Sequence, residues 1–389
     1  MLPYSCSFCF KQIISVRSQL RIGWRSKSGE DTPLKRLLDN AASFGEAEPT
    51  DPELQWATQP YATTQKRPFI SPRTNPQETT VLLFPGQGSQ QVGMGKNLQK
   101  INAAKELYQL ASSVVGWDVE KLCINGPSNE LEKRCQTAVF VTSLAALELL
   151  RDSRPSAIER VRAVAGFSLG EITALVCAGA LQFEQALCVV EIRAAAMNAA
   201  ASTHKGGMLT VWLTADANLP HAMLRAREHA VEKGVVQPIC QVANYLFPHC
   251  KVVAGDEEAL RYLEKNGKQY GIKRTARVRV AGAFHTPAMQ SAIEVMTQAL
   301  RVIEIKNPNV KVISGVDAKP YRDASHVRRQ LGKQIVAPVR WEQTLHALYA
   351  RPVGEPFPFT VALGPGGALR STLKLVNAKA WDSSLQIEV

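Results

Sequence analysis

A serine stands between two glycines in the stretch Gly166-Phe167-Ser168-Leu169-Gly170, after an apolar run and before a helical pattern. A strand, a sharp turn and a helix form the setting of a nucleophile elbow, in which the serine hydroxyl lies at the helix N-terminus. Backbone N–H groups and the helix dipole there favour a developing oxyanion. The short motif also occurs as an ordinary turn, so its position between strand and helix is what indicates that Ser168 is a nucleophile.

A serine hydroxyl needs a general base near neutral pH, and His285 is the histidine best placed to supply it. It ends the block Gly282-Ala283-Phe284-His285, at a second strand-to-helix junction that we expect on the same rim of the sheet. A histidine at such a junction can equally cap a helix. No Asp between Ser168 and His285 stands at a strand end, so no carboxylate partner of a hydrolase triad is identified. The other histidines fall in polar or helical-surface contexts: His204, His221, His229, His249, His326 and His346.

Arg193 lies among apolar and small residues in a helical pattern. A guanidinium in such surroundings must be compensated for its lost hydration, and a bidentate carboxylate can do this. That carboxylate could belong to a ligand, or to a salt bridge with Glu171 or Glu191, which the residues alone favour. The turn Gly86-Gln87-Gly88 lacks the Lys of a P-loop and the spacing of a dinucleotide motif, so it predicts an oxyanion donor rather than a nucleotide site.

Apolar strands alternate with helices through most of the chain. Strands are expected over 81–84, 161–167, 310–316 and 359–363, and helices over 136–151, 169–178, 183–200 and 287–302, with two short helices before the last strand. Short apolar strands separated by helices predict an α/β fold with a parallel sheet covered on both faces.

The middle of the chain has a different order of elements. Its pattern predicts strand 208–213, helix 219–233, strand 239–245, strand 251–254, helix 257–270 and strand 272–280. This is the split βαβ order, so residues 206–280 are predicted to form a ferredoxin-like small lobe. Residues 79–205 and 281–389 would then form a large lobe, with a cleft between the two.

The first 29 residues differ in composition from the rest. They hold five basic residues, six serines and no acid, within a chain of formal net charge +12. A basic, serine-rich and acid-free leader is typical of an organellar presequence, so we predict a mitochondrial transit peptide over 1–29, the alternative being a disordered basic tail. Residues 30–78 are polar and interrupted by prolines, which predicts a linker or surface extension.

The overall composition is that of a globular protein, with 389 residues, 45 % hydrophobic and 21 % charged. Its longest apolar stretches fall short of the roughly 20 residues that a bilayer crossing needs, so no membrane association is expected. The basic residues form no block that would indicate a nucleic-acid partner. Cys6 and Cys9 form a lone CxxC in the predicted presequence, with no second pair and no nearby His, and the other six cysteines lack the spacing of metal ligands. We therefore expect neither a metal nor another cofactor.

Together these motifs resemble the malonyl-CoA:acyl carrier protein transacylase family in its mitochondrial form. The resemblance covers about residues 81–375, and six blocks in the same order make it far more specific than any one motif. The blocks are Phe84-Pro85-Gly86-Gln87-Gly88-Ser89-Gln90, Gly166-Phe167-Ser168-Leu169-Gly170-Glu171, Arg193 with Met197, Gly282-Ala283-Phe284-His285, Pro338-Val339-Arg340-Trp341 and Gly364-Pro365-Gly366. The family has a hydrolase-like large lobe with an inserted ferredoxin-like small lobe, which agrees with the order of elements above.

The resemblance also implies roles for the candidate residues. Ser168 would carry the acyl group and His285 would act as general base and acid. The backbone carbonyl of Gln334, rather than an Asp, would orient that histidine. Backbone N–H groups of Gln87 and Leu169 would form the oxyanion hole.

Three further side chains are implied to bind the acyl group. Arg193 would bind the free carboxylate of the malonyl group, and Gln136 matches an active-site glutamine of the family. Phe284 belongs to an Ala-Phe-His block that, in related domains, goes with malonyl rather than branched methylmalonyl substrates. Phe167 replaces a histidine found in many members, where we expect a change of packing and no loss of chemistry.

These roles imply transfer of a malonyl group from malonyl-CoA to the phosphopantetheine thiol of acyl carrier protein, through a malonyl-serine, for fatty acid synthesis in the mitochondrial matrix. Two other readings stay open. A serine esterase or thioesterase would use the same elbow, but it predicts a triad Asp and makes no use of Arg193. A binding module for acyl carrier protein or RNA could keep the acyltransferase shell without turnover.

Overall fold

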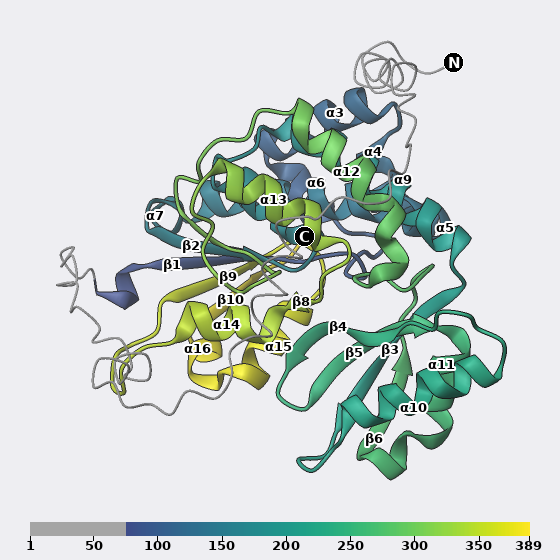
Figure 1. Cartoon of the computed structure of the whole chain (residues 1–389). Helices are drawn as coiled ribbons and strands as arrows, with labels where there is room; N and C mark the ends of the chain where they lie inside the picture. Colours follow the sequence, from purple (N-terminus) through teal and green to yellow (C-terminus); the bar gives the residue numbers. More distant parts are fainter. Residues whose placement is uncertain (1–74) are drawn as a thin grey trace, which may run out of the picture. The chain divides into compact units, whose positions relative to one another are not determined.

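A computed structural model describes residues 75–389 of the chain (Figure 1). The predicted transit peptide over 1–29 and most of the predicted linker over 30–78 lie outside the described residues. The first described element is a 3-10 turn, η3 (Pro76–Glu78), in which the backbone N–H of Gln77 donates to the Asn75 side chain. In residues 75–389, none of the helices combines the length and the apolar character that a membrane crossing requires.

Five parallel strands form the sheet of the large lobe, in the order β10-β9-β1-β2-β7. Their bounds are β1 (Thr80–Phe84), β2 (Val161–Gly166), β7 (Lys311–Ile313), β9 (Phe359–Leu363) and β10 (Ser384–Ile387). All five residues of β1 are buried, because helices cover both faces of the sheet. The parallel sheet predicted from the apolar runs is therefore confirmed, with β7 shorter than expected and β10 as an additional edge strand.

Side chains on the two faces of this sheet enter separate cores. Leu82 and Phe84 of β1 pack into a large cluster with apolar residues of α3 (Asn102–Val115), α6 (Cys135–Ser153), α9 (Phe183–Thr203) and α12 (Gln290–Val302). Leu83 points the other way, into a smaller cluster with Trp341 and Leu345 of α14 (Trp341–Tyr349) and with residues of α15 (Ala368–Val376) and α16 (Ala378–Asp382). Figure 1 shows these two groups of helices on opposite sides of the strands. The alternation along β1 is the period of two that a strand buried on both faces requires.

The large lobe contains the helices that the sequence predicts and several more. The predicted helices correspond to α6 (Cys135–Ser153), α8 (Leu169–Cys177), α9 (Phe183–Thr203), α12 (Gln290–Val302), α13 (Ala324–Gln334) and α14 (Trp341–Tyr349), with a short η6 (Pro287–Met289) ahead of α12. Not predicted were η4 (Lys96–Lys100), α3 (Asn102–Val115), α4 (Val119–Asn125), α5 (Ser128–Lys133), α7 (Pro155–Glu159), α15 (Ala368–Val376) and α16 (Ala378–Asp382).

The small lobe has the predicted split βαβ order. It contains β3 (Gly206–Leu213), α10 (Leu219–Glu232), β4 (Cys240–Phe247), β5 (Cys250–Asp256), α11 (Glu257–Asn266), η5 (Gly267–Tyr270) and β6 (Ile272–Arg277). The order β6-β3-β5-β4, antiparallel throughout, is that of a ferredoxin-like sheet. A fifth strand, β8 (Val339–Arg340), joins β4 in parallel from the later part of the chain, and the exact limits of the two lobes stay a prediction.

Candidate active site

Ser168 occupies the turn between β2 and α8 with a backbone φ of 53°, in the positive region that non-glycine residues rarely adopt. Two close backbone approaches make this turn possible. A Cβ on Gly166 would lie 1.9 Å from the carbonyl carbon of Gly170, and a Cβ on Gly170 would lie 2.1 Å from the carbonyl oxygen of Phe84. Only glycine fits at both positions, and the resulting bend holds Ser168 at the N-terminus of α8.

The Ser168 hydroxyl belongs to a chain of hydrogen bonds with a defined direction. Its Oγ lies 2.8 Å from Nε2 of His285, and Nδ1 of His285 lies 2.9 Å from the backbone oxygen of Gln334. A carbonyl oxygen only accepts, so Nδ1 carries the ring hydrogen. Nη2 of Arg193 donates to Ser168 Oγ over 2.8 Å, which leaves the serine to donate its own proton to Nε2. This is the arrangement that a general base needs.

His285 is buried, and burial lowers the pKa of its ring to about 4. The positive charge of Arg193 lowers the pKa further, while the hydrogen bond to Gln334 opposes the shift. The imidazole is therefore neutral at physiological pH, with the Nε2 lone pair available to the serine proton.

Arg193 is 1 % exposed and has no carboxylate in contact with its guanidinium among residues 75–389. Nη1 donates to Gln136 Oε1 over 2.6 Å, and Nη2 donates to Gln334 Oε1 over 3.2 Å as well as to Ser168. The Nε–H has no hydrogen-bond partner within the described part of the chain. The prediction of a salt bridge with Glu171 or Glu191 is wrong, because the guanidinium donates to neutral oxygens in place of a carboxylate. Burial lowers the Arg193 pKa to about 10, which still leaves it charged at neutral pH.

The two backbone N–H groups expected to bind an oxyanion belong to the elbow and to the loop packed against it. Leu169 is the first residue of α8, and the first four N–H groups of a helix have no acceptor within it. Gln87 follows β1, and its loop packs closely against the elbow, since a Cβ on Gly86 would lie 2.4 Å from the backbone oxygen of Phe167. The Gln87 side chain also accepts a hydrogen bond from Gln136 Nε2 over 3.3 Å.

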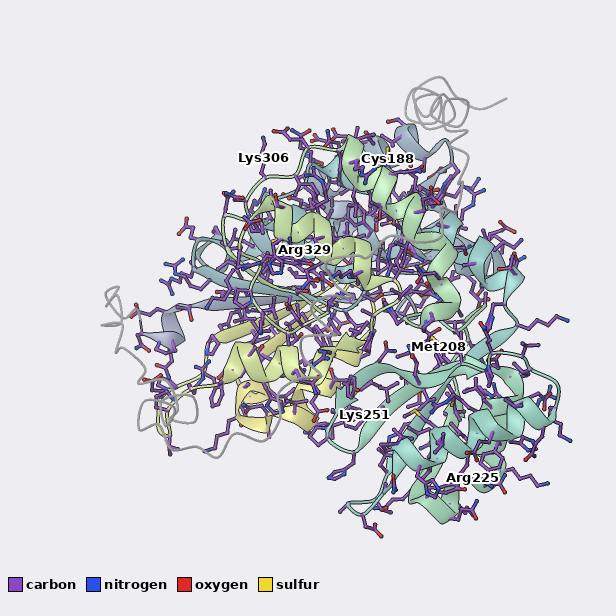
Figure 2. The ribbon with its side chains drawn as sticks, viewed as in Figure 1. Cys188, Met208, Arg225, Lys251, Lys306 and Arg329 are labelled. Atoms are coloured by element: carbon purple, nitrogen blue, oxygen red, sulfur yellow. The ribbon has the colours of Figure 1, made fainter. Side chains whose placement is uncertain are left out.

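A cavity of about 340 Å³ opens over Ser168. The large lobe contributes Arg193, His285, Phe284 and Trp341 to its wall, and the small lobe contributes apolar and polar residues of β3, β4 and β5. Met208 marks the small-lobe side in Figure 2, at the junction of the two lobes. Phe167 also lines the cavity and packs edge-on against Trp341, with ring centroids 5.7 Å apart, so it contributes packing as expected.

The comparisons with known proteins agree with this site. Residues 81–355 match the model of the acyl transferase domain. The chain is 51 % identical over 318 residues to a probable malonyl-CoA-acyl carrier protein transacylase, mitochondrial, of Drosophila melanogaster, covering 81 % of this chain and 84 % of the relative. It is 46 % identical over 332 residues to the mitochondrial transacylase of Homo sapiens, covering 85 % of this chain and 83 % of the relative. The chain belongs to the malonyl-CoA-acyl carrier protein transacylase family.

Solved structures of transacylases share the fold. An acyl carrier protein S-malonyltransferase of Vibrio cholerae superposes with a TM-score of 0.71 at 27 % identity, over 80 % of this chain and 97 % of the other. A malonyl-transacylase in complex with a type II polyketide synthase acyl carrier protein superposes with a TM-score of 0.69 at 29 % identity, over 80 % and 96 %. The predicted fold class, a hydrolase-like parallel-sheet lobe with a ferredoxin-like lobe, is confirmed.

Sequence reasoning missed a buried network behind the transacylase site. Glu171, in the first turn of α8, is fully buried and is bonded by Tyr321, Gln334 and the backbone N–H of Gly315. An acidic residue in the first turn of a helix is usually a solvent-exposed one, so the motif alone gave no signal. His326 is 6 % exposed and accepts a hydrogen bond from a backbone N–H, so the expected surface context is wrong for this histidine.

Proposed function

We propose that the protein transfers a malonyl group from malonyl-CoA to the phosphopantetheine thiol of acyl carrier protein, with Ser168 carrying the group between the two. One observation carries the proposal. The buried cation of Arg193 lies 2.8 Å from the Ser168 hydroxyl, and its hydrogen-bond partners within residues 75–389 are all neutral oxygens. A serine esterase has no need of such a charge, whereas an acyl group that ends in a carboxylate supplies its missing partner.

The first half-reaction forms the malonyl-serine. His285 Nε2 takes the serine proton as Ser168 Oγ attacks the thioester carbonyl of malonyl-CoA. The N–H groups of Gln87 and Leu169 bind the tetrahedral oxyanion, and one such donor is worth about 3 kcal/mol. The intermediate collapses with loss of CoA, which leaves as the thiol after receiving the proton from His285.

The second half-reaction is the reverse with a different thiol. The phosphopantetheine thiol of acyl carrier protein enters the emptied cavity and gives its proton to His285 as the sulfur attacks the serine ester. Collapse of the second tetrahedral intermediate returns the proton to Ser168 and leaves a malonyl thioester on the carrier. Because CoA leaves before the carrier thiol enters the same cavity, the kinetics are ping-pong.

Recognition of the malonyl group rests on Arg193, with Gln136 and Phe284 around it. Gln136 holds Nη1 of the guanidinium by a 2.6 Å hydrogen bond, which fixes the plane of the fork. Phe284 is buried beside His285 and forms part of the apolar wall. An acetyl group brings no carboxylate, so Arg193 stays uncompensated and acetyl transfer is disfavoured.

The proposed site of action is the mitochondrial matrix. The relatives from Drosophila melanogaster, Homo sapiens and Mus musculus are named mitochondrial. The basic, acid-free composition of residues 1–29 supports import by a transit peptide.

The test is intact mass spectrometry of the full chain after brief exposure to malonyl-CoA and, separately, to acetyl-CoA. A malonyl adduct that forms readily, exceeds the acetyl adduct and is lost in Ser168→Ala is the expected result. Release of free malonate without any adduct would favour a thioesterase, and absence of reaction with either thioester would favour a binding module.

A further inference from the structure

A buried polar chain runs from Tyr321 through Glu171 and Gln334 to Arg193. We propose that Glu171 is a positioning residue for acyl-group selectivity, which acts by fixing the orientation of the Gln334 side-chain amide. The inference rests on the proposed function, because it concerns how Arg193 is presented to the carboxylate of the substrate.

Each end of the Glu171 carboxylate has its own donors. Oε1 accepts from the backbone N–H of Gly315 over 3.0 Å and from the hydroxyl of Tyr321. Oε2 accepts from Nε2 of Gln334. Glu171 is 0 % exposed, so no water competes for these bonds.

The Gln334 amide is in turn held at both of its ends. Its Nε2 also donates to the backbone oxygen of Ser168 over 3.0 Å, while its Oε1 accepts from Arg193 Nη2 over 3.2 Å. The Ser168 backbone oxygen only accepts, so the NH2 group of the amide must face that oxygen and the neighbouring Oε2 of Glu171. The amide oxygen is left facing Arg193, which only donates. The Glu171 carboxylate and the Ser168 backbone oxygen thus together determine which end of Gln334 the guanidinium meets.

The opposite orientation of Gln334 would disrupt the site. It would set the amide NH2 against the guanidinium of Arg193 and the amide oxygen against the Glu171 carboxylate. Both contacts would be between like groups, and a buried donor without an acceptor is costly. Since the backbone oxygen of Gln334 also holds His285, the same residue links acyl recognition to the base.

Glu171→Gln tests this link with almost no change of shape. The two donors Gly315 N–H and Tyr321 hydroxyl retain the new amide oxygen at the place of Oε1. Its NH2 group then lies opposite Gln334 Nε2, donor against donor, so the Gln334 amide keeps only the Ser168 oxygen as an acceptor and is held less firmly against Arg193. We expect the ratio of malonyl to acetyl transfer onto Ser168, measured as initial rates by intact mass, to fall about tenfold or more.

A control variant at a second buried carboxylate separates an effect on selectivity from an effect on stability. Asp256→Asn alters another buried carboxylate that accepts a backbone N–H, that of Ile239, and lies outside the cavity wall. Its ratio of malonyl to acetyl transfer should equal that of the unaltered protein, even if its melting temperature falls as far as that of Glu171→Gln.

Tyr321→Phe removes only the hydroxyl that helps to hold Glu171, and its control is Tyr349→Phe, which loses the buried hydroxyl bonded to Thr360. Tyr321→Phe should lower the ratio in the same direction by a smaller factor, and Tyr349→Phe should leave it unchanged. If Glu171→Gln does not fold, this second pair decides.

Equal losses of malonyl and acetyl transfer in a folded Glu171→Gln, or an unchanged ratio in Tyr321→Phe where it alone folds, would overturn the inference. Failure of the proposed function has a different signature. In that case the unaltered protein itself would form no malonyl adduct, or would show no preference for malonyl over acetyl.

Discussion

Nη2 of Arg193 donates a hydrogen bond to Ser168 Oγ over 2.8 Å, so the group proposed to bind the carboxylate touches the atom to be acylated. This contact has two consequences. It leaves the serine proton no partner but His285, which sets the direction of proton transfer. It also places a positive charge beside His285, where it lowers the pKa of the ring. Substrate selection and base activation are therefore coupled through one guanidinium.

Arg193→Ala should separate the two substrates. A malonyl carboxylate would enter a buried site without its cation, which by analogy with broken buried ion pairs costs about 3–5 kcal/mol. We therefore expect malonyl transfer to fall by about a hundredfold or more and acetyl transfer to change far less. Initial rates of adduct formation with the two CoA thioesters provide the measurement. Equal losses on both would contradict a carboxylate clamp.

The pH dependence of acylation should reflect the depressed pKa of His285. Because burial and Arg193 hold this pKa at about 4, the ring stays neutral on acidification from pH 7 and becomes protonated only near pH 4. The rate of malonyl transfer should fall on the acid side of pH 5 and not near 6.5. Removing the cation in Arg193→Ala should move the acid limb of acetyl transfer to higher pH. An acid limb near 6.5 in the unaltered protein would contradict the buried, neutral base.

The same pKa shift predicts a change in stability with pH. The folded pKa of His285 lies below the ordinary histidine value of 6.5, so between pH 6.5 and 4 the unfolded chain binds a proton that the folded chain does not. The contribution of His285 to the free energy of unfolding is full above pH 6.5 and is lost as the pH falls to 4. Denaturant unfolding of His285→Gln should show a shallower loss over this window than the unaltered protein. Parallel curves would show that His285 titrates normally in the folded state.

The glycines of the elbow should be intolerant of even one methyl group. In Gly170→Ala the new Cβ would lie 2.1 Å from the Phe84 carbonyl oxygen, so β1 and α8 must move apart and Ser168 with them. We expect a clear drop in melting temperature and loss of malonyl transfer.

Gly332→Ala is the matched control for this prediction. Gly332 lies within α13, and in the described part of the chain its added Cβ would make an ordinary contact with Thr297 Oγ1 at 3.6 Å outside its own helix. The protein should keep its activity and gain up to about 1 kcal/mol, since alanine favours a helix over glycine. A tolerated Gly170→Ala would show that the elbow is not as tightly packed as its backbone contacts indicate.

Much of the fold could be predicted because its strongest signals are local. β1 and β2 are apolar runs that end in glycine-containing turns, and the order of the small-lobe elements determines its antiparallel sheet. β10 was missed because Ser384–Ile387 is four residues long and only partly buried, too short for either period to show. α3 and α15 were also missed, although both helices are amphipathic.

The site could be predicted only where side chains carry the chemistry. Ser168, His285 and Arg193 stand out by residue type and placement, and the structure brings them into contact. The oxygen that accepts the His285 Nδ1–H belongs to the backbone of Gln334. A backbone group has no signature in the sequence, so only the family resemblance identified Gln334. Glu171 is buried by partners about 150 residues further along the chain, and no local pattern reports contacts at that distance.

The small lobe is fastened to the large one beside the cavity. Lys251 of β5 forms an ion pair with Glu342 in the first turn of α14, and their side chains are 16 % and 14 % exposed. Next to this pair, β8 joins the small-lobe sheet through β4, bringing Asn244 opposite Val339. Asn244 and Val252, the residue after Lys251, line the cavity, so the ion pair helps to position one of its walls.

Glu342→Gln should therefore loosen that wall. Lys251 would be left largely buried without its counter-charge, which we expect to lower the free energy of unfolding by about 1–2 kcal/mol after allowance for residual solvent. The KM for malonyl-CoA should rise several-fold with little change in kcat, because Ser168, His285 and Arg193 all belong to the large lobe.

The exposed pair of Arg225, labelled in Figure 2, with Glu228 on α10 provides the control, with side chains 51 % and 44 % exposed. Glu228→Gln should leave the free energy of unfolding nearly unchanged and both kinetic constants unchanged, because solvent screens this pair. A double-mutant cycle with Lys251→Met measures the coupling between Lys251 and Glu342 directly. If that coupling is no larger than for Arg225 with Glu228, the ion pair does not hold the lobe, and the β4–β8 pairing alone must position the wall.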